Sequence, residues 1–163
     1  MNRAAGFTWI EMMIVLGVAA LLALMAIPAL RDRAVRKQVE EGFALADVAK
    51  GGVQAAWSAT GRMPADNQAA GVPAHDRIVG SYVSDVAVED GAITVTFGNN
   101  ASKVLEGKRL TVRPAVVADE RAVPIAWLCH AIAVPNGMQV RGRDATDLPP
   151  EWLPVDCRAR AAH

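Results

Sequence analysis

Residues 7–33 form the most apolar stretch of the chain and read FTWIEMMIVLGVAALLALMAIPALRDR. No charged residue occurs from Met12 to Leu30, and Arg31 follows directly. As a helix this run is about 28 Å long, which is enough to cross the hydrocarbon core of a bilayer. It is longer than the apolar region of a secretory signal peptide, and no A-x-A cleavage site follows it. The sequence therefore predicts a membrane-spanning helix over residues 7–30, and a simple signal anchor is one interpretation of it.

A single carboxylate, Glu11, lies at the start of this apolar stretch. A charge inside a bilayer costs about 2.5–3.5 kcal/mol on insertion scales and usually has a partner. The nearby cation would be the α-amine that cleavage between Gly6 and Phe7 creates. That amine is poorly placed to meet Glu11 of its own rigid helix, but it can meet Glu11 of a neighbouring copy, which favours assembly in a set register. The alternative is that Glu11 lies at the headgroup level and is simply solvated.

The residues around this glutamate resemble the processing signal and helix start of type IV pilins, which are subunits of bacterial filaments. The resemblance rests on residues 6–15, which read GFTWIEMMIV, and on the Ala-Ile-Pro sequence at 26–28. In that family a prepilin peptidase cuts after the glycine and methylates the new N-terminus. The resemblance implies that residues 1–6 are a leader, that Gly6 and Phe7 flank the cleavage site, and that Phe7 becomes N-methylated.

The resemblance also implies assembly roles for Glu11, as the assembly glutamate, and for Pro28, as a helix-kinking proline. A proline inside a helix removes a hydrogen bond and costs about 3 kcal/mol, so bundled subunits could bend or unwind there. A plain kink, or the end of the helix, is the alternative. Three features depart from the family pattern. Trp9 stands where leucine is usual, the leader has one basic residue, Arg3, rather than several, and Gly17 lies further upstream of Pro28 than the family's usual helix glycine.

Residues 31–57 change to an amphipathic pattern with apolar residues every three or four positions. The stripe consists of Val35, Val39, Phe43, Ala46, Ala49, Val53 and Trp57. We expect this half of the helix to lie against a sheet. An unbroken helix over 7–57 would be about 75 Å long, too long for a compact domain, so its apolar half is expected to protrude. Gly42, Gly51 and Gly52 weigh against an unbroken helix.

Residues 58–163 are expected to form a globular head that begins with an irregular loop over 58–77. Alternating patterns predict four strands. They are placed at 82–88, 93–97, 108–113 and 125–129. The turn Glu89-Asp90-Gly91 joins the first two as a hairpin. The fold class is therefore α+β: a long N-terminal helix, with a protruding apolar half and an amphipathic half, packed on a four-stranded antiparallel sheet that is followed by a C-terminal disulfide loop.

The two cysteines, Cys129 and Cys157, do not form a CxxC motif. In an exported chain such a pair indicates a disulfide, and two unrelated buried thiols are the alternative. In type IV pilins the segment between the cysteines is an exposed, variable and often adhesive loop, which the resemblance implies here. One signal opposes export, because basic residues are concentrated on the C-terminal flank of the span and would retain the head in the cytoplasm. They are Arg31, Arg33, Arg36 and Lys37. The cysteine pair and the resemblance favour a periplasmic head.

No arrangement of residues predicts an active site, a metal site or a cofactor. His75, His130 and His163 are scattered, and no HExxH, GxSxG or Walker pattern occurs. His130 is expected to be a surface or packing residue. Asp144, Asp147 and Glu151 could form a calcium site, but they lack EF-hand spacing and are expected to be solvated loop acids. Contacts to DNA backbone would need basic residues in excess, and here acids balance the cluster of Arg141, Arg143, Arg158 and Arg160. The chain is therefore expected not to be an enzyme.

The function predicted from the sequence is that of a structural subunit of a type IV pilus. Its partners would be other copies of itself, the prepilin peptidase, the inner membrane before assembly and the pilus assembly machinery. The precursor would be a single-pass inner-membrane protein with a periplasmic C-terminal domain, and the assembled pilus would be extracellular. Fibres of this family serve adhesion, twitching motility or DNA uptake, although nothing in the sequence supports DNA or a host surface as a partner. The alternatives are a minor pilin, a pseudopilin of type II secretion, or a signal-anchored periplasmic binding domain.

Overall fold

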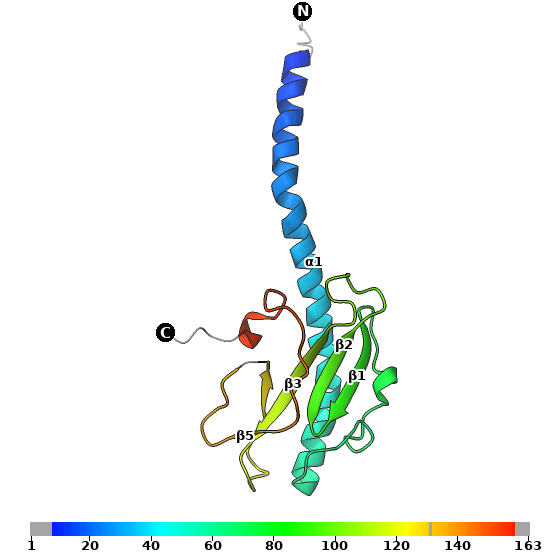
Figure 1. The fold of residues 1–163 in the computed structure, drawn as a ribbon, viewed down its shortest axis with the longest axis vertical. Helices are drawn as coiled ribbons and strands as arrows, with labels where there is room; N and C mark the ends of the chain where they lie inside the picture. The colour runs from blue at the N-terminus through cyan, green and yellow to red at the C-terminus, as the bar shows by residue number, and fades with distance from the viewer. Residues whose placement is uncertain (1–7, 131, 159–163) are drawn as a thin grey trace, which may run out of the picture. The chain divides into compact units, whose positions relative to one another are not determined.

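A computed structural model describes residues 8–130 and 132–158 of the chain. By contacts within the chain, it consists of two compact units, Met1–Ala34 and Val35–His163. The helix α1 (Trp9–Thr60) contributes to both units, and the second unit also contains an antiparallel sheet and an irregular C-terminal segment (Figure 1). The helix therefore continues past the Trp57 expected as its end and includes the three glycines that weighed against continuity.

The apolar stripe of α1 packs on the sheet as predicted. Val39, Ala46, Ala49 and Val53 are fully or almost fully buried, and Phe43 packs partly buried against the same core. Gly42 explains how the helix comes so close. A Cβ at this position would lie 2.8 Å from the ring of Phe97, closer than real Cβ atoms approach other atoms. Glycine is therefore needed here for packing rather than for flexibility.

Four antiparallel strands follow in the order β1-β2-β3-β4, which confirms the predicted meander. They are β1 (Val83–Glu89), β2 (Ala92–Phe97), β3 (Arg109–Val116) and β4 (Ala126–Cys129). A fifth strand, β5 (Gln139–Val140), pairs with the end of β3. Ala115 of β3 pairs with both Ala126 and Val140, so β5 lies on the β2 side of β3. Sequence analysis missed β5 because two residues carry no periodic pattern.

The strand β3 is longer than the predicted 108–113 because it continues through Pro114. Proline has no N–H to donate and normally excludes a central strand. Here the pairing of β2 with β3 ends at Val112, so no β2 residue faces Pro114. The carbonyl of Pro114 instead accepts a hydrogen bond from the N–H of Arg141 at 2.9 Å. The prediction stopped early because this partner is distant in sequence.

The loop between α1 and the sheet is held on the edge of β1 by one buried side chain, Asn67. Its Nδ2 donates to the carbonyls of Pro73 and Val86 at 2.9 and 3.0 Å. Its Oδ1 accepts from the N–H of Val88 at 2.7 Å. The Asn67 amide therefore satisfies both a carbonyl and an N–H on the β1 edge, as a neighbouring strand would. Exposed edges are sites of unwanted pairing between chains, and this contact blocks part of one.

The same loop contains a short 3₁₀ helix, η1 (His75–Arg77), that contacts β1 through an ion pair. Nδ1 of His75 bonds with the carboxylate of Asp85. The hydrogen bond to Asp85 and then the negative charge of Asp85 raise the pKa of His75 above its ordinary value of 6.5. The charge of Asp76 adds a smaller contribution in the same direction. His75, which was expected to be an isolated loop residue, therefore helps to fix the loop on the sheet.

We predict that Asn67→Asp destabilises the head. A carboxylate cannot donate to the two carbonyls that Asn67 now reaches, and the substitution buries a charge beside them. The expected loss is about 3 kcal/mol in the free energy of unfolding, measured by chemical denaturation of the full chain in detergent. Asn136→Asp is the matched control, since Asn136 is exposed and the described part of the chain offers it no hydrogen bond. Equal stability of the two variants would contradict the edge-capping role.

We also predict that His75 titrates above pH 6.5 in the folded chain. Because the folded pKa is raised, the His75–Asp85 pair stabilises the loop fully below pH 6.5, and this stabilisation is lost as the pH rises through the folded pKa. An NMR titration of the His75 ring measures the midpoint directly. Asp85→Asn should return the midpoint towards 6.5, whereas Asp76→Asn should lower it much less. A midpoint at or below 6.5 in the unchanged chain would show that the pair does not form.

Candidate functional site

The N-terminus of α1 holds the carboxylate of Glu11 in a capping box. Oε2 of Glu11 accepts hydrogen bonds from the backbone N–H of Thr8 at 3.0 Å and from its hydroxyl at 2.8 Å. The N–H of Glu11 lies 3.4 Å from Oγ1 of Thr8, which completes the reciprocal pattern. The expectation that Glu11 lacks a partner in its own chain was therefore incomplete. Thr8 supplies hydrogen bonds, but within residues 8–130 and 132–158 no cation forms an ion pair with this carboxylate.

From Trp9 to Leu30, α1 presents large apolar side chains that are 48–78% exposed in the isolated chain. The most apolar window of α1 has a mean hydropathy of 2.6, and none of it is buried within the chain. By length and composition this part of the helix could cross a membrane, although a signal sequence would have the same properties. An apolar surface of this extent requires lipid or other protein to cover it.

The processing roles predicted for Gly6 and Phe7 and the assembly roles predicted for Glu11 and Pro28 remain predictions. Gly6 and Phe7 lie outside the described residues. Pro28 lies within α1, which is helical on both sides of it. The cleavage and methylation expected at Gly6 and Phe7, and the kink expected at Pro28, are therefore taken up below as proposals.

The cysteine pair forms the expected disulfide between Cys129 and Cys157, with 5.1 Å between the two Cα atoms. Leu148, Leu153 and Cys157 of the segment that it closes belong to the core that also contains the stripe of α1, whereas Ala145 and Thr146 lie on the opposite face of the sheet. Thr94 and Thr111 pair on that face, and their hydroxyls lie 3.0 Å apart. The hydroxyl of Thr111 accepts from the N–H of Ala145, while its own N–H donates to Oγ1 of Thr146. Part of the predicted exposed loop is thus a second cover of the sheet, and Thr111 is fully buried beneath it.

A polar cluster of Arg113, His130 and Asp144 fixes this covering segment. Oδ2 of Asp144 lies 3.3 Å from Nδ1 of His130 and 3.9 Å from Nη2 of Arg113. Burial raises the pKa of Asp144, but two hydrogen bonds from Thr146 and the charges of Arg113 and His130 outweigh it and hold that pKa below its usual range. Nδ1 of His130, which was expected to be a surface or packing residue, lies beside the Asp144 carboxylate but has no hydrogen-bond partner within the described residues.

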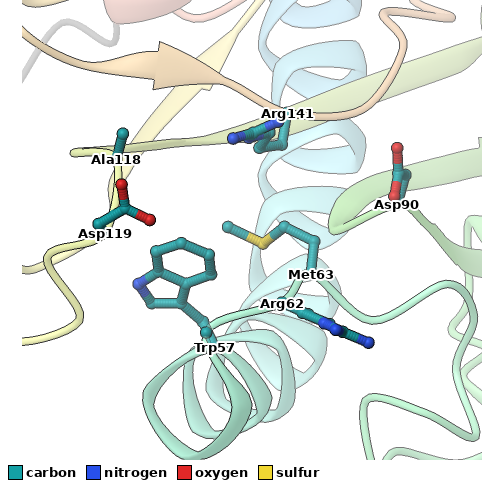
Figure 2. Close-up of a pocket in the computed structure, with 8 residues that line it drawn as sticks. Trp57, Arg62, Met63, Asp90, Ala118, Asp119 and Arg141 are labelled. Atoms are coloured by element: carbon teal, nitrogen blue, oxygen red, sulfur yellow. The ribbon is translucent and has the colours of Figure 1, made fainter.

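A surface pocket of about 410 Å³ lies at the C-terminal end of α1. Its floor is the indole of Trp57, which is 6% exposed, together with Met63 (Figure 2). Its rim carries two arginines and two aspartates from four different segments of the chain. These are Arg62, Asp90, Asp119 and Arg141. The indole N–H of Trp57 is buried and has no hydrogen-bond acceptor within the described residues.

Comparison with known proteins identifies the family. Residues 35–158 match the family model of pilins, described as bacterial filament proteins, and residues 1–27 match the model of the prokaryotic N-terminal methylation motif. The chain belongs to the pilin family. Pilins are a structural protein family, so this chain is not an enzyme.

Several curated relatives of this pilin cover nearly its whole length. A fimbrial protein of Eikenella corrodens, EcpC, is 41% identical over 161 residues, which are 96% of this chain and 92% of the relative. The type IV major pilin protein PilE1 of Neisseria gonorrhoeae is 34% identical over 164 residues, 96% of this chain and 88% of the relative. A fimbrial protein of Neisseria meningitidis serogroup B is 34% identical over 162 residues, 94% of this chain and 93% of the relative.

The acids considered for calcium do not come together in this pilin. Asp147 accepts from the N–H of Arg109 and lies 3.6 Å from its Nε, and Glu151 is exposed. Within the described residues, no group of three His, Cys, Asp or Glu side chains could hold a metal ion. Arg158 donates to the carbonyls of Glu151 and Leu153, so it stabilises the cysteine-closed segment. Arg160, the fourth member of the basic cluster, lies outside the described residues.

Proposed function

We propose that this chain is the precursor of a type IV pilin, a structural subunit that polymerises through its N-terminal helix into a surface pilus. The observation that carries the proposal is the exposed apolar surface of α1 with a single carboxylate, Glu11, at its beginning. No soluble monomer leaves such a surface bare, since it must be covered by lipid or by other copies. The relatives named as type IV major pilins support the main subunit of the fibre over a minor pilin or a pseudopilin.

Processing comes first in the proposed sequence of events. The precursor sits in the inner membrane through residues 7–30, with the head, 58–163, in the periplasm after the amphipathic half at 31–57. The disulfide supports this orientation, because such bonds persist in oxidising compartments. Prepilin peptidase then removes residues 1–6 by cutting between Gly6 and Phe7 and methylates the new N-terminus at Phe7.

Polymerisation then depends on Glu11. Its charge has hydrogen bonds from Thr8, but no cation among the described residues 8–130 and 132–158 pairs with it. In the filament the α-amine of Phe7 from a neighbouring copy supplies that cation, which neutralises both charges in an apolar core and sets the register of the helices. Pro28 allows the bundled helices to bend. The assembly machinery draws the subunit from the membrane, and the resulting extracellular fibre serves adhesion, twitching motility or DNA uptake.

Mass spectrometry of the N-terminal peptide tests the processing step. We expect protein from filaments to begin at Phe7 and to carry one added methyl group. In the same cells without the prepilin peptidase, we expect residues 1–6 to remain attached and no filaments to form. A mature chain that begins at Met1, or after Leu30, would show that this is a simple anchor or a cleaved signal.

A substitution of Glu11 separates its charge from its capping role. Glu11→Gln removes the charge but keeps a side chain suited to the capping box with Thr8. We expect the variant to insert, to be processed and to fold normally, while filament yield falls by about tenfold or more, the effect of losing a charge-pair contact. Glu40→Gln, an exposed glutamate on the same helix, is the matched control. Normal filament yield from Glu11→Gln would rule out the charge-pair mechanism.

A further inference from the structure

We infer that the pocket at the C-terminal end of α1 binds the loop between β2 and β3 of a second copy, residues 102–107. The inference rests on the proposed function, because it requires copies stacked in a filament. It adds a contact between heads to the contact between apolar helices.

The four charges on the rim of the pocket are available for a partner. Arg62, Asp90, Asp119 and Arg141 are all exposed, and none of them forms an ion pair within the described part of the chain. Arg141 has one hydrogen bond, to Oε1 of Gln139. The rim thus combines two positive and two negative groups around an apolar floor. Such a site fits a partner that also presents an apolar group between charges of opposite sign.

Figure 2 shows how these charges are separated. The carboxylate of Asp119 lies on one side of the Trp57 ring, and the guanidinium of Arg62 lies on the other. The side chain of Met63 lies over the floor between the helix end and Arg141. Asp90 lies on the same side of the Trp57 ring as Arg62, so the Asp119 side is negative and the other side carries charges of both signs.

The loop at residues 102–107 presents the matching pattern. Lys103 and Glu106 are exposed and without ion pairs in the described structure, and Val104 between them is 46% exposed. The loop is rigid because Leu105 is fully buried and because the N–H groups of Leu105 and Glu106 both donate to the carbonyl of Ser102. A preorganised loop loses little entropy on binding.

The loop and the pocket lie at opposite ends of the helix segment that carries the head. Ser102 donates its N–H to Oε1 of Gln38, whereas the pocket floor is formed by Trp57. These two helix positions are about 28 Å apart along an α-helix. Copies stacked with the same polarity bring such opposite ends together, and contacts of this heterologous kind do not close on themselves but continue along a fibre.

Docking then pairs complementary groups. Val104 packs on Trp57 and Met63, Lys103 faces the Asp119 side of the pocket, and Glu106 faces the Arg62 side. We therefore assign the pocket to a second copy of this chain. A small zwitterionic ligand would leave the exposed Lys103, Val104 and Glu106 without a contact.

Cysteine cross-linking in intact filaments tests the contact. The paired substitution Val104→Cys with Ala118→Cys places one thiol on the loop and one on the pocket wall. After oxidation we expect a ladder of covalent multimers in denaturing gels, removed by reductant. Val155→Cys with Ala118→Cys is the control pair, since Val155 is 78% exposed but lies in η2 (Val155–Cys157), outside the loop. Filaments of the first pair that show no ladder above the control would overturn the inference.

A charge exchange provides the second measurement and does not depend on the added thiols. Lys103→Glu and Asp119→Lys should each lower filament yield by about tenfold, and the double variant should recover most of the loss. Single variants with full yield, or a double variant no better than either, would also overturn the contact. If the unchanged chain forms no filament at all, the proposed function fails and this inference fails with it. Filaments that form normally without the cross-link or the rescue defeat the inference alone.

Discussion

The helix α1 comes into close contact with the sheet where Gly42 faces the ring of Phe97, and the geometry of the head depends on this contact. Glycine here, followed by Ala46 and Ala49, makes the stripe thin, so the helix axis can approach the strands. A wider stripe would lift the helix and open the core beneath it. Residues that would be poor choices for helix stability alone are therefore good choices for packing.

The close contact also explains the polar groups at the margin of the helix. Oε1 of Gln38 accepts from the N–H of Ser102, and Oε1 of Glu41 accepts from the N–H of Tyr82. These two loops come so near to α1 that their N–H groups lose their hydrogen bonds to water. Side chains of the helix must therefore accept from them instead. At the other end, Arg121 donates to the carbonyl of Ala59 and supplies the positive charge that the last turn lacks.

The sequence predicted the elements of the fold better than their partners. The stripe on α1, the order of the four strands and the disulfide all came from local patterns or from the family resemblance. Three features could not be predicted in this way: the contact of Asn67 with the edge of β1, the continuation of β3 through Pro114, and the segment that covers Thr111. Each of these depends on a residue far away in the chain, and neither periodicity nor propensity reports such contacts.

The same limit applies to the candidate site. Glu11 was predicted from a charge in an apolar run together with the resemblance. Its bond to Thr8 was missed, although Thr8-x-x-Glu11 before an apolar run is a capping-box signature. The rim of the pocket around Trp57 could not be predicted from the sequence, because it is assembled from four segments that have no common spacing. A signal was present only in part, since Trp57 ends the apolar stripe and thereby places an aromatic ring at the end of the core.

The capping box changes what the Glu11 charge can contribute to assembly. A carboxylate with no partner would gain the whole energy of a new ion pair, whereas one already bonded to Thr8 gains only the difference. The desolvation of a buried pair consumes much of that difference. The apolar surface of α1, with its many side chains exposed in the isolated chain, must therefore supply most of the energy of association. In the proposed filament Glu11 acts instead on register, because an apolar helix can slide along its neighbour at little cost until one position leaves a charge unpaired.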